Sequence, residues 1–147
     1  MVNLVGEYER QLDERGRIIL PAKLRDEIKG TVYITRASSE KCLRLYTESE
    51  WQKLSEKVNQ LPVTTDPHAA AFVRMFFGKA TSGTVDKQGR IVIDKKLIDY
   101  AGLDKEVVLV GASTKLEIWD TYEWNKYQES LSESIMMEGV LKYNLNI

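Results

Sequence analysis

The residues best suited to chemistry in this sequence are arginines in two short, related segments. Residues 13–17 read DERGR and residues 86–90 read DKQGR, so each segment has an aspartate, a glycine and an arginine at the spacing D-x-x-G-R. A guanidinium group can donate two parallel hydrogen bonds to guanine O6 and N7 or to phosphate oxygens. A tight turn that holds such groups outward therefore favours nucleic-acid binding. The pattern is weak when it occurs once, and its duplication makes it informative.

The basic residues in and around these segments form the predicted DNA-binding set. From position 10 to position 25 the chain has five basic and two acidic residues, a local charge of about +3, whereas the whole chain carries −1. Attraction to DNA phosphates requires a local patch of this kind. We assign DNA contacts to Arg15, Arg17, Lys23, Arg25, Lys87 and Arg90, and the turn itself to Asp13, Gly16, Asp86 and Gly89.

The aspartates have a structural interpretation that competes with a functional one. Asp13 lies four residues before Arg17 across the turn, where it can form an ion pair and accept hydrogen bonds from turn amides. We prefer this structural role for the aspartates. For the arginines we prefer DNA contact, because an exposed ion pair contributes only about 0–1 kcal/mol and does not require further cations nearby. Arg15 is the arginine with the weakest structural interpretation.

Both segments belong to an internal repeat that organises most of the chain. Residues 13–26 (DERGRIILPAKLRD) return 73 positions later as residues 86–99 (DKQGRIVIDKKLID). Self-similarity of this kind predicts two copies of one structural unit. The correspondence continues in two later pairs of segments, 31–38 with 106–113 and 43–51 with 116–124.

Each copy is predicted to contain a strand, a tight turn, a second strand, a short helix and two further strands. Gly16 and Gly89 each follow three polar residues, as in a hairpin turn whose glycine adopts positive φ. Residues 18–20 and 91–93 are apolar throughout, so both faces of these strands are expected to be buried.

Helix signals follow the second strand of each copy and recur at the end of the copy. Pro21 suits the first turn of one short helix, and Asp94 and Gly102 suit the two ends of the other. Longer helices are expected after Thr47 and Asp120, because a glutamate three residues later gives capping-box spacing. One apolar face of each is expected to pack, formed by Leu54, Val58 and Leu61 in the first and by Tyr127, Leu131 and Ile135 in the second.

The fold class predicted from these elements is mainly β with peripheral α-helices (α+β), built from two internal repeats. We expect the first repeat over residues 7–49 and the second over residues 78–121. Residues 50–77 are expected to form connecting helices, one of them opened by Pro67 and ended by Gly78. Residues 122–147 are expected to form a C-terminal helix and tail.

Composition and missing motifs argue against catalysis and metal binding. One cysteine, Cys42, excludes an intrachain disulfide, and a single histidine, His68, leaves too few ligands for a His/Cys zinc site. We expect Cys42 to be buried and His68 to make a local contact at a helix start. The sequence has no GxxxxGK[ST], HExxH or GxSxG pattern. We therefore expect no enzyme activity, no catalytic or metal-binding residue, no cofactor and no small-molecule ligand.

The expected cellular compartment is the cytoplasm, with association to the nucleoid. No apolar stretch approaches the roughly 20 residues that span a bilayer, so no membrane partner is expected. The start MVNLVGEYER has no apolar run of signal-peptide length. With 43% hydrophobic residues and nearly balanced charges, the chain is expected to form a soluble globule whose DNA contacts come from a local patch.

At its duplicated segments the chain closely resembles the MraZ family of transcriptional regulators. The resemblance also covers GEYER near the start, FFGKAT before the second repeat and LEIWD after it. It implies tandem SpoVT/AbrB-type modules that interlock as a double-psi, swapped-hairpin β-barrel, with copies assembling into a ring-shaped homo-oligomer. It also implies a repressor that binds direct repeats in double-stranded promoter DNA of the division and cell-wall gene cluster, which includes its own gene.

The resemblance places the family's turn positions on Asp13 and Arg17 and on Asp86 and Arg90, with the first copy presenting the more basic surface. The common family form has lysine where this chain has Arg15. In the second copy Gln88 stands at that position and Asp94 replaces Pro21, which argues against an equal DNA role for both copies. Two other functions remain open, an AbrB-type antitoxin and an assembly protein that does not bind DNA.

Overall fold

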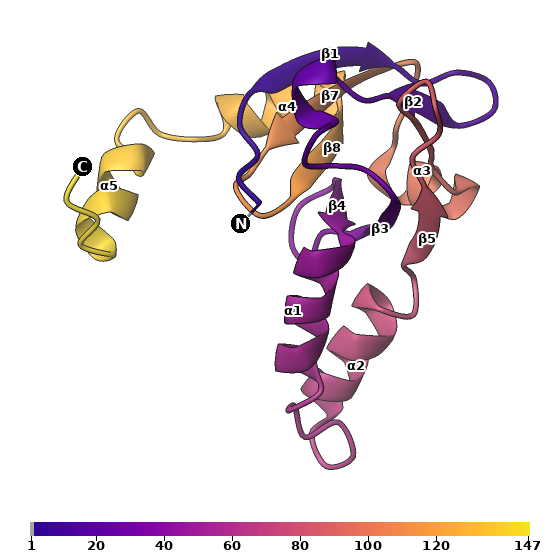
Figure 1. Ribbon diagram of the computed structural model, residues 1–147. Helices are drawn as coiled ribbons and strands as arrows, with labels where there is room; N and C mark the ends of the chain where they lie inside the picture. Colours follow the sequence, from indigo (N-terminus) through magenta and orange to yellow (C-terminus); the bar gives the residue numbers. More distant parts are fainter. Residues whose placement is uncertain (1) are drawn as a thin grey trace.

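The computed structural model describes residues 2–147 and has a mixed α+β fold (Figure 1). An antiparallel six-stranded sheet has the order β1-β7-β8-β4-β3-β5, and a two-stranded ribbon consists of β2 and β6. The predicted fold class, mainly β with peripheral helices, is confirmed at this level. The strands are β1 Glu7–Gln11, β2 Arg17–Ile19, β3 Thr31–Arg36, β4 Leu43–Thr47, β5 Thr81–Thr84, β6 Arg90–Val92, β7 Glu106–Gly111 and β8 Leu116–Asp120, and the helices are η1 Ala22–Leu24, α1 Glu48–Val58, α2 Pro67–Phe76, α3 Lys95–Ala101, α4 Thr121–Glu129 and α5 Ile135–Lys142.

Strand pairing follows an internal twofold relation between the repeats. β1 pairs with β7 and β5 pairs with β3, while β2 pairs with β6 and β4 pairs with β8. The strands β1 to β4 correspond in sequence to β5 to β8. Exchanging the two repeats therefore turns the β1–β7 pair into the β5–β3 pair and leaves the β2–β6 and β4–β8 pairs unchanged. The first two strands of each repeat thus pair with strands of the other repeat. Neither repeat completes its sheet alone, and the two share one core.

The prediction of a hairpin in each repeat is wrong, because the two strands that flank each turn pair with other strands. The tight turns are present, with φ of +75° at Gly16 and +78° at Gly89, and Asp13 N donates to Arg17 O at 3.0 Å. Beyond that bond the flanking strands separate, because β1 enters the six-stranded sheet and β2 enters the ribbon. Alternation of side chains tells which face of a strand is buried, but it does not specify the partner strand.

The main core lies between the ribbon and the six-stranded sheet. Ile18 and Ile91, the middle residues of β2 and β6, are almost completely buried in it, and each such side chain contributes roughly 1.5–3 kcal/mol through burial. The expectation that both faces of these strands are buried is wrong: Ile19 is 48% exposed and Val92 is 63% exposed. A ribbon that packs one face against the core leaves its other face open.

The two short helices differ in length because their N-termini differ in chemistry. Asp94 caps α3 by accepting a hydrogen bond from Lys96 N at 3.1 Å, and Gly102 ends the helix with φ of +62°, as predicted. In the first repeat Pro21 has no side-chain acceptor, and the predicted helix is reduced to the 3-10 turn η1. The absence of a cap leaves the first amides of such a turn without a side-chain partner.

Helices α1 and α2 extend side by side from the sheet (Figure 1). Thr47 caps α1 and Pro67 opens α2, in agreement with the sequence. Trp51 of α1 stacks on Tyr33 of β3 with ring centroids 4.9 Å apart, and Phe76 of α2 stacks on Trp51 at 6.1 Å. This aromatic cluster attaches the α1–α2 pair to the first repeat.

The C-terminal region departs from the predicted continuous helix face. Asp120 caps α4, but the helix ends at Glu129, where Ser130 Oγ donates to Tyr127 O at 2.6 Å. Leu131 is 38% exposed and Ile135 is 45% exposed, so the prediction that they pack is wrong. The apolar residues keep helical spacing through residues 130–134, so the sequence pattern gives no sign that the helix is interrupted there. Helix α5 stands apart from the body of the molecule (Figure 1).

Candidate nucleic-acid interface

The first D-x-x-G-R turn is organised by its aspartate. Asp13 Oδ1 accepts hydrogen bonds from the backbone amides of Arg15 and Arg17, both at 2.9 Å. Asp13 Oδ2 accepts a hydrogen bond from Arg17 Nε at 2.7 Å. The carboxylate therefore holds both the turn backbone and the base of the Arg17 guanidinium group.

The second turn repeats this geometry. Asp86 Oδ1 accepts from Gln88 N at 2.9 Å and from Arg90 N at 2.8 Å, and Asp86 Oδ2 accepts from Arg90 Nε at 2.7 Å. The second turn has one contact that the first turn does not have: Arg90 Nη2 also donates to Gln88 Oε1 at 3.4 Å. The aspartates of both turns thus have the structural role that the spacing suggests.

Both aspartates remain ionised at neutral pH. The pKa of Asp13 is lowered mainly by the hydrogen bond from the Arg17 amide, with further lowering by the Arg17 side chain and the Arg15 amide. The pKa of Asp86 is lowered mainly by the corresponding Arg90 amide. An ionised carboxylate that accepts the Nε proton orients the arginine while it offsets part of its charge.

The two turns lie at opposite ends of the β2–β6 ribbon. Leu20 N donates to Gly89 O at 2.8 Å, and Ile93 N donates to Gly16 O at 2.7 Å, so each turn is bonded to the end of the other repeat's strand. A Cβ atom on Gly16 would stand 2.8 Å from Ile93 O. Glycine is therefore required there both for its positive φ and for this close approach.

The open face of the ribbon presents two arginines and two aliphatic side chains. In the strand register Arg17 lies opposite Val92, and Arg90 lies opposite Ile19. The arginine side chains are 27% and 31% exposed. Within residues 2–147, the terminal nitrogens of Arg17 donate no hydrogen bond, so this group can still form two bonds to a ligand.

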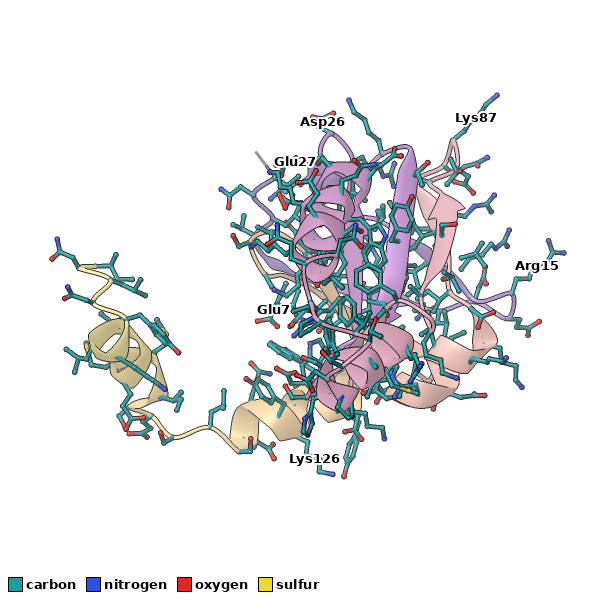
Figure 2. All side chains as sticks on the ribbon, turned by 90° about the horizontal axis from the view of Figure 1, so that it is seen from below. Glu7, Arg15, Asp26, Glu27, Lys87 and Lys126 are labelled. Atoms are coloured by element: carbon teal, nitrogen blue, oxygen red, sulfur yellow. The ribbon has the colours of Figure 1, made fainter. Side chains whose placement is uncertain are left out.

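The predicted cations at the turn tips point into solvent. Figure 2 shows the side chains of Arg15 and Lys87 extending from the side of the molecule opposite α5. Both residues are exposed. Lys23 is also exposed, in the last turn of η1. These three long side chains can reach phosphates that flank the ribbon.

Arg25 and Arg10 support the ribbon through backbone carbonyls. Arg25 Nε donates to Leu20 O at 3.0 Å, and its guanidinium group covers the Gly89 turn. Arg10, which the sequence places in the basic segment without a specific role, donates from Nε to Ile19 O at 3.1 Å. The positions of these arginines in the sequence do not predict such contacts, because the order of the strands decides which backbone carbonyl lies beside each guanidinium group.

The arrangement suits entry into a DNA groove. A two-stranded antiparallel ribbon fits the major groove of B-DNA, which is about 12 Å wide, and arginine can donate two hydrogen bonds to guanine there. The exposed cations at the ribbon ends can contact the phosphate backbone and set the position of the ribbon.

The remaining candidate groups are structural. Cys42 is fully buried, and burial is the main cause that raises the pKa of its thiol to about 12. Asp66 accepts a hydrogen bond from His68 N at 2.9 Å at the start of α2, which confirms a local contact for this residue. In residues 2–147 no cluster of His, Cys, Asp or Glu could hold a metal ion. None of the helices in this range is long and apolar enough to cross a bilayer.

Comparison with known proteins gives a consistent result over almost the whole chain. The family model described as "MraZ protein, putative antitoxin-like" matches residues 4–74 and again residues 76–139. A protein of Clostridium acetobutylicum named "Transcriptional regulator MraZ" is 43% identical over 126 residues, which cover 86% of this chain and 87% of that protein. A protein of the same name from Acetivibrio thermocellus is 41% identical over 142 residues, 92% of this chain and 98% of its own length.

Proposed function

The chain belongs to the MraZ family, and we propose that it is a transcriptional regulator that binds double-stranded promoter DNA sequence-specifically. The proposed action is repression, through direct repeats upstream of the division and cell-wall gene cluster that includes its own gene. The names of the two relatives support a role in transcription. The family resemblance of the duplicated turns supports the finer assignment.

One observation carries the DNA-binding proposal, namely two arginines anchored on the open face of a two-stranded ribbon. Each guanidinium group is oriented by a 2.7 Å hydrogen bond from Nε to an aspartate. An arginine that is already oriented loses less side-chain freedom when it binds, so more of its interaction energy contributes to affinity. Asp13 and Asp86 are therefore positioning residues in this proposal, while Arg17 and Arg90 contact bases.

The proposal is tested by footprinting on the DNA upstream of the protein's own gene. At low ionic strength we expect the wild-type chain to protect evenly spaced direct repeats, because several identical ribbons would bind at once. The matched control is Arg17→Ala, which should protect none of them at the same protein concentration. A wild-type chain that protects no promoter segment at low salt would contradict the proposal.

We also propose that copies of the chain assemble into a ring. The supporting observation is the apolar surface of the C-terminal segment, where Met136 is 79% exposed and Leu141 is 73% exposed. A helix of eight residues that stands apart from the body of the molecule is marginal in water, so a docking surface on another copy would stabilise it (Figure 1). Linked modules also raise the effective concentration of each turn near its DNA repeat, so weak single contacts become sufficient.

Light scattering in solution tests the assembly. The wild-type chain should have the mass of a closed oligomer, and Leu141→Asp should lower that mass because a buried charge is costly at an apolar contact. Glu138→Gln, in the same helix, is the matched control and should leave the mass unchanged. A monomeric wild-type chain would contradict the ring, and an unchanged mass for Leu141→Asp would exclude α5 from it.

The remaining family features complete the proposal. The exchange of strands between repeats supports an AbrB-like swapped-hairpin barrel, with the repeats over residues 7–49 and 78–121 and helical regions over 50–77 and 122–147. DNA contact would come mainly from Arg15, Arg17, Lys23 and Arg25, with Lys87 and Arg90 adding less. We propose a cytoplasmic, nucleoid-associated protein that needs no cofactor or small-molecule ligand.

The family description favours a second candidate function, because it contains the term antitoxin-like. An AbrB-type antitoxin would bind and neutralise a protein toxin through a segment that extends beyond its DNA-binding module. Footprinting combined with affinity purification from the native cell separates the two functions. Protection of direct repeats without a stoichiometric protein partner favours the regulator, whereas a stoichiometric partner whose toxicity the chain suppresses favours the antitoxin.

A further inference from the structure

Two exposed aliphatic side chains share the open face of the ribbon with the anchored arginines. Ile19 is 48% exposed and Val92 is 63% exposed. Ile19 lies opposite Arg90, and Val92 lies opposite Arg17, so the face alternates between cationic and apolar groups in both directions.

The internal repeat singles out these two positions. Ile19 and Val92 are equivalent under the 73-residue offset, and both are β-branched aliphatic residues although neither is needed in the core. Other exposed positions of the turns differ between the copies, as when Gln88 stands in place of Arg15. Scattered exposed aliphatic residues are ordinary, but Ile19 and Val92 lie together on the face that carries the two anchored arginines.

The ribbon dimensions match those of neighbouring base pairs. Residues directly opposite each other in an antiparallel pair have Cβ atoms about 4.5–5.5 Å apart. Residues two positions apart on one strand are separated by about 7 Å, which is roughly two base-pair steps of 3.4 Å. An arginine that reaches one base pair therefore places its aliphatic neighbour against the next one or two.

We propose that Ile19 and Val92 read thymine by contact with its 5-methyl group in the major groove. This inference rests on the proposed DNA-binding function and adds the base class that the apolar half of the ribbon recognises. The methyl group is the only apolar group that distinguishes thymine from other bases at the major-groove edge. The recognised unit is then a guanine, bound by Arg17 or Arg90, beside a thymine bound by the cross-strand aliphatic residue.

Replacing thymine with deoxyuridine removes the methyl group and leaves base pairing intact. The probe is a duplex of the promoter segment that the wild-type chain protects, with its thymines changed one at a time. For the wild-type chain, at least one thymine replacement in each direct repeat of the DNA should weaken binding roughly fourfold. This is the effect of removing one methyl-sized group from an apolar contact. The double variant Ile19→Ser, Val92→Ser should bind the thymine and deoxyuridine duplexes equally.

The matched control is Val5→Ser, because Val5 is also 63% exposed but lies before β1, outside the ribbon. This variant should keep the wild-type response to deoxyuridine. The inference is overturned if no thymine of the protected segment responds in the wild type, or if the double variant keeps the same response. A double variant with a changed mass in light scattering would instead place these residues at a subunit contact and would also overturn it.

Failure of the broader DNA-binding proposal would be recognised separately. In that case the wild-type chain would not bind even the unmodified thymine duplex at low salt. Binding of that duplex without any response to deoxyuridine would leave the regulator in place and remove only the thymine contact.

Discussion

The two repeats hold nearly identical turns in different surroundings. Asp13 and Asp86 form the same three hydrogen bonds, each to two amides and one Nε, at 2.7 to 2.9 Å. Around them the side chains have diverged: Arg25 covers the Gly89 turn, whereas Ile98 of the second repeat approaches the Gly16 turn. The contrast indicates that the carboxylate and the glycine set the backbone geometry of the turn, that the arginine side chain keeps the same position on the carboxylate in both copies, and that the charge outside these three residues can vary.

A similar contrast separates the helical additions to the repeats. In the first repeat α2 returns to the sheet, where Phe76 stacks on Trp51 and Thr35 Oγ1 donates to Phe76 O. In the second repeat α5 remains apart from its own α4 (Figure 1). The helical addition of the first repeat therefore packs on its own sheet, whereas that of the second repeat leaves Met136 and Leu141 exposed. The copies share a scaffold but differ in how their helices pack.

The sharpest test of the comparison is the replacement of the equivalent arginines. Arg17→Ala should weaken operator binding by about a hundredfold or more, because a bidentate base contact worth about 1–3 kcal/mol is lost from several subunits together. Arg90→Ala should weaken it by only about tenfold, because one terminal nitrogen of Arg90 already donates to Gln88, so Arg90 has fewer free donors for a base than Arg17 has. Gel-shift titrations measure both, with unchanged mass in light scattering as the control. Equal losses would show that the copies contribute alike.

The turn glycines provide a second test, on stability. Gly16→Ala should lower the free energy of unfolding by about 2–3 kcal/mol, through a strained positive φ and a Cβ only 2.8 Å from Ile93 O. Gly89→Ala should cost about 1–2 kcal/mol, because its Cβ meets the guanidinium group of Arg25, which can move aside with the loss of its hydrogen bond to Leu20 O, whereas Ile93 O belongs to the backbone. Urea unfolding followed by circular dichroism measures both values. A larger loss for Gly89→Ala would contradict this ranking.

A smaller effect is expected at the tips of the turns. Arg15→Ala should weaken binding by about tenfold or less and reduce the slope of log K against log salt by about one for each lost phosphate contact. Gln88→Ala, at the equivalent position, should leave that slope unchanged because glutamine carries no charge. Fluorescence anisotropy over a range of salt concentrations makes the comparison. An unchanged slope for Arg15→Ala would exclude a phosphate contact for this residue.

The smallest expected effect is the response of the turns to mild acid. Because the turn amides and the arginine side chains hold the pKa values of Asp13 and Asp86 below the ordinary value for an aspartate, both carboxylates stay ionised from about pH 8 to about pH 5. Their contribution to stability is fully present above the unfolded-state pKa and is lost as pH falls through the lower folded-state pKa. The difference in unfolding free energy between wild type and Asp13→Asn should therefore be constant in this range and shrink below about pH 4. A difference that changes between pH 8 and pH 5 would contradict the assignment.

Features that depend on a few neighbouring residues agree with the predictions from the sequence. These are the positive φ of Gly16 and Gly89, the caps at Thr47, Asp94 and Asp120, and the burial of Cys42. The predicted burial of Ile19 and Val92 is wrong, because an apolar run shows that a strand is hydrophobic but does not show how many layers cover it. The predicted helix after Asp120 is too long, because a continuous periodic pattern does not reveal the break at Ser130.

The duplicated turns follow from local sequence alone, because each aspartate reaches an arginine only four residues away and each glycine needs no distant partner for its conformation. That the two turns belong to one surface is a property of the fold. Their strands pair across a separation of about 73 residues, and this pairing brings both arginines and both aliphatic residues to one open face. Local hydrogen bonds shape a turn, whereas the choice of partner strand depends on how the whole chain buries its apolar residues.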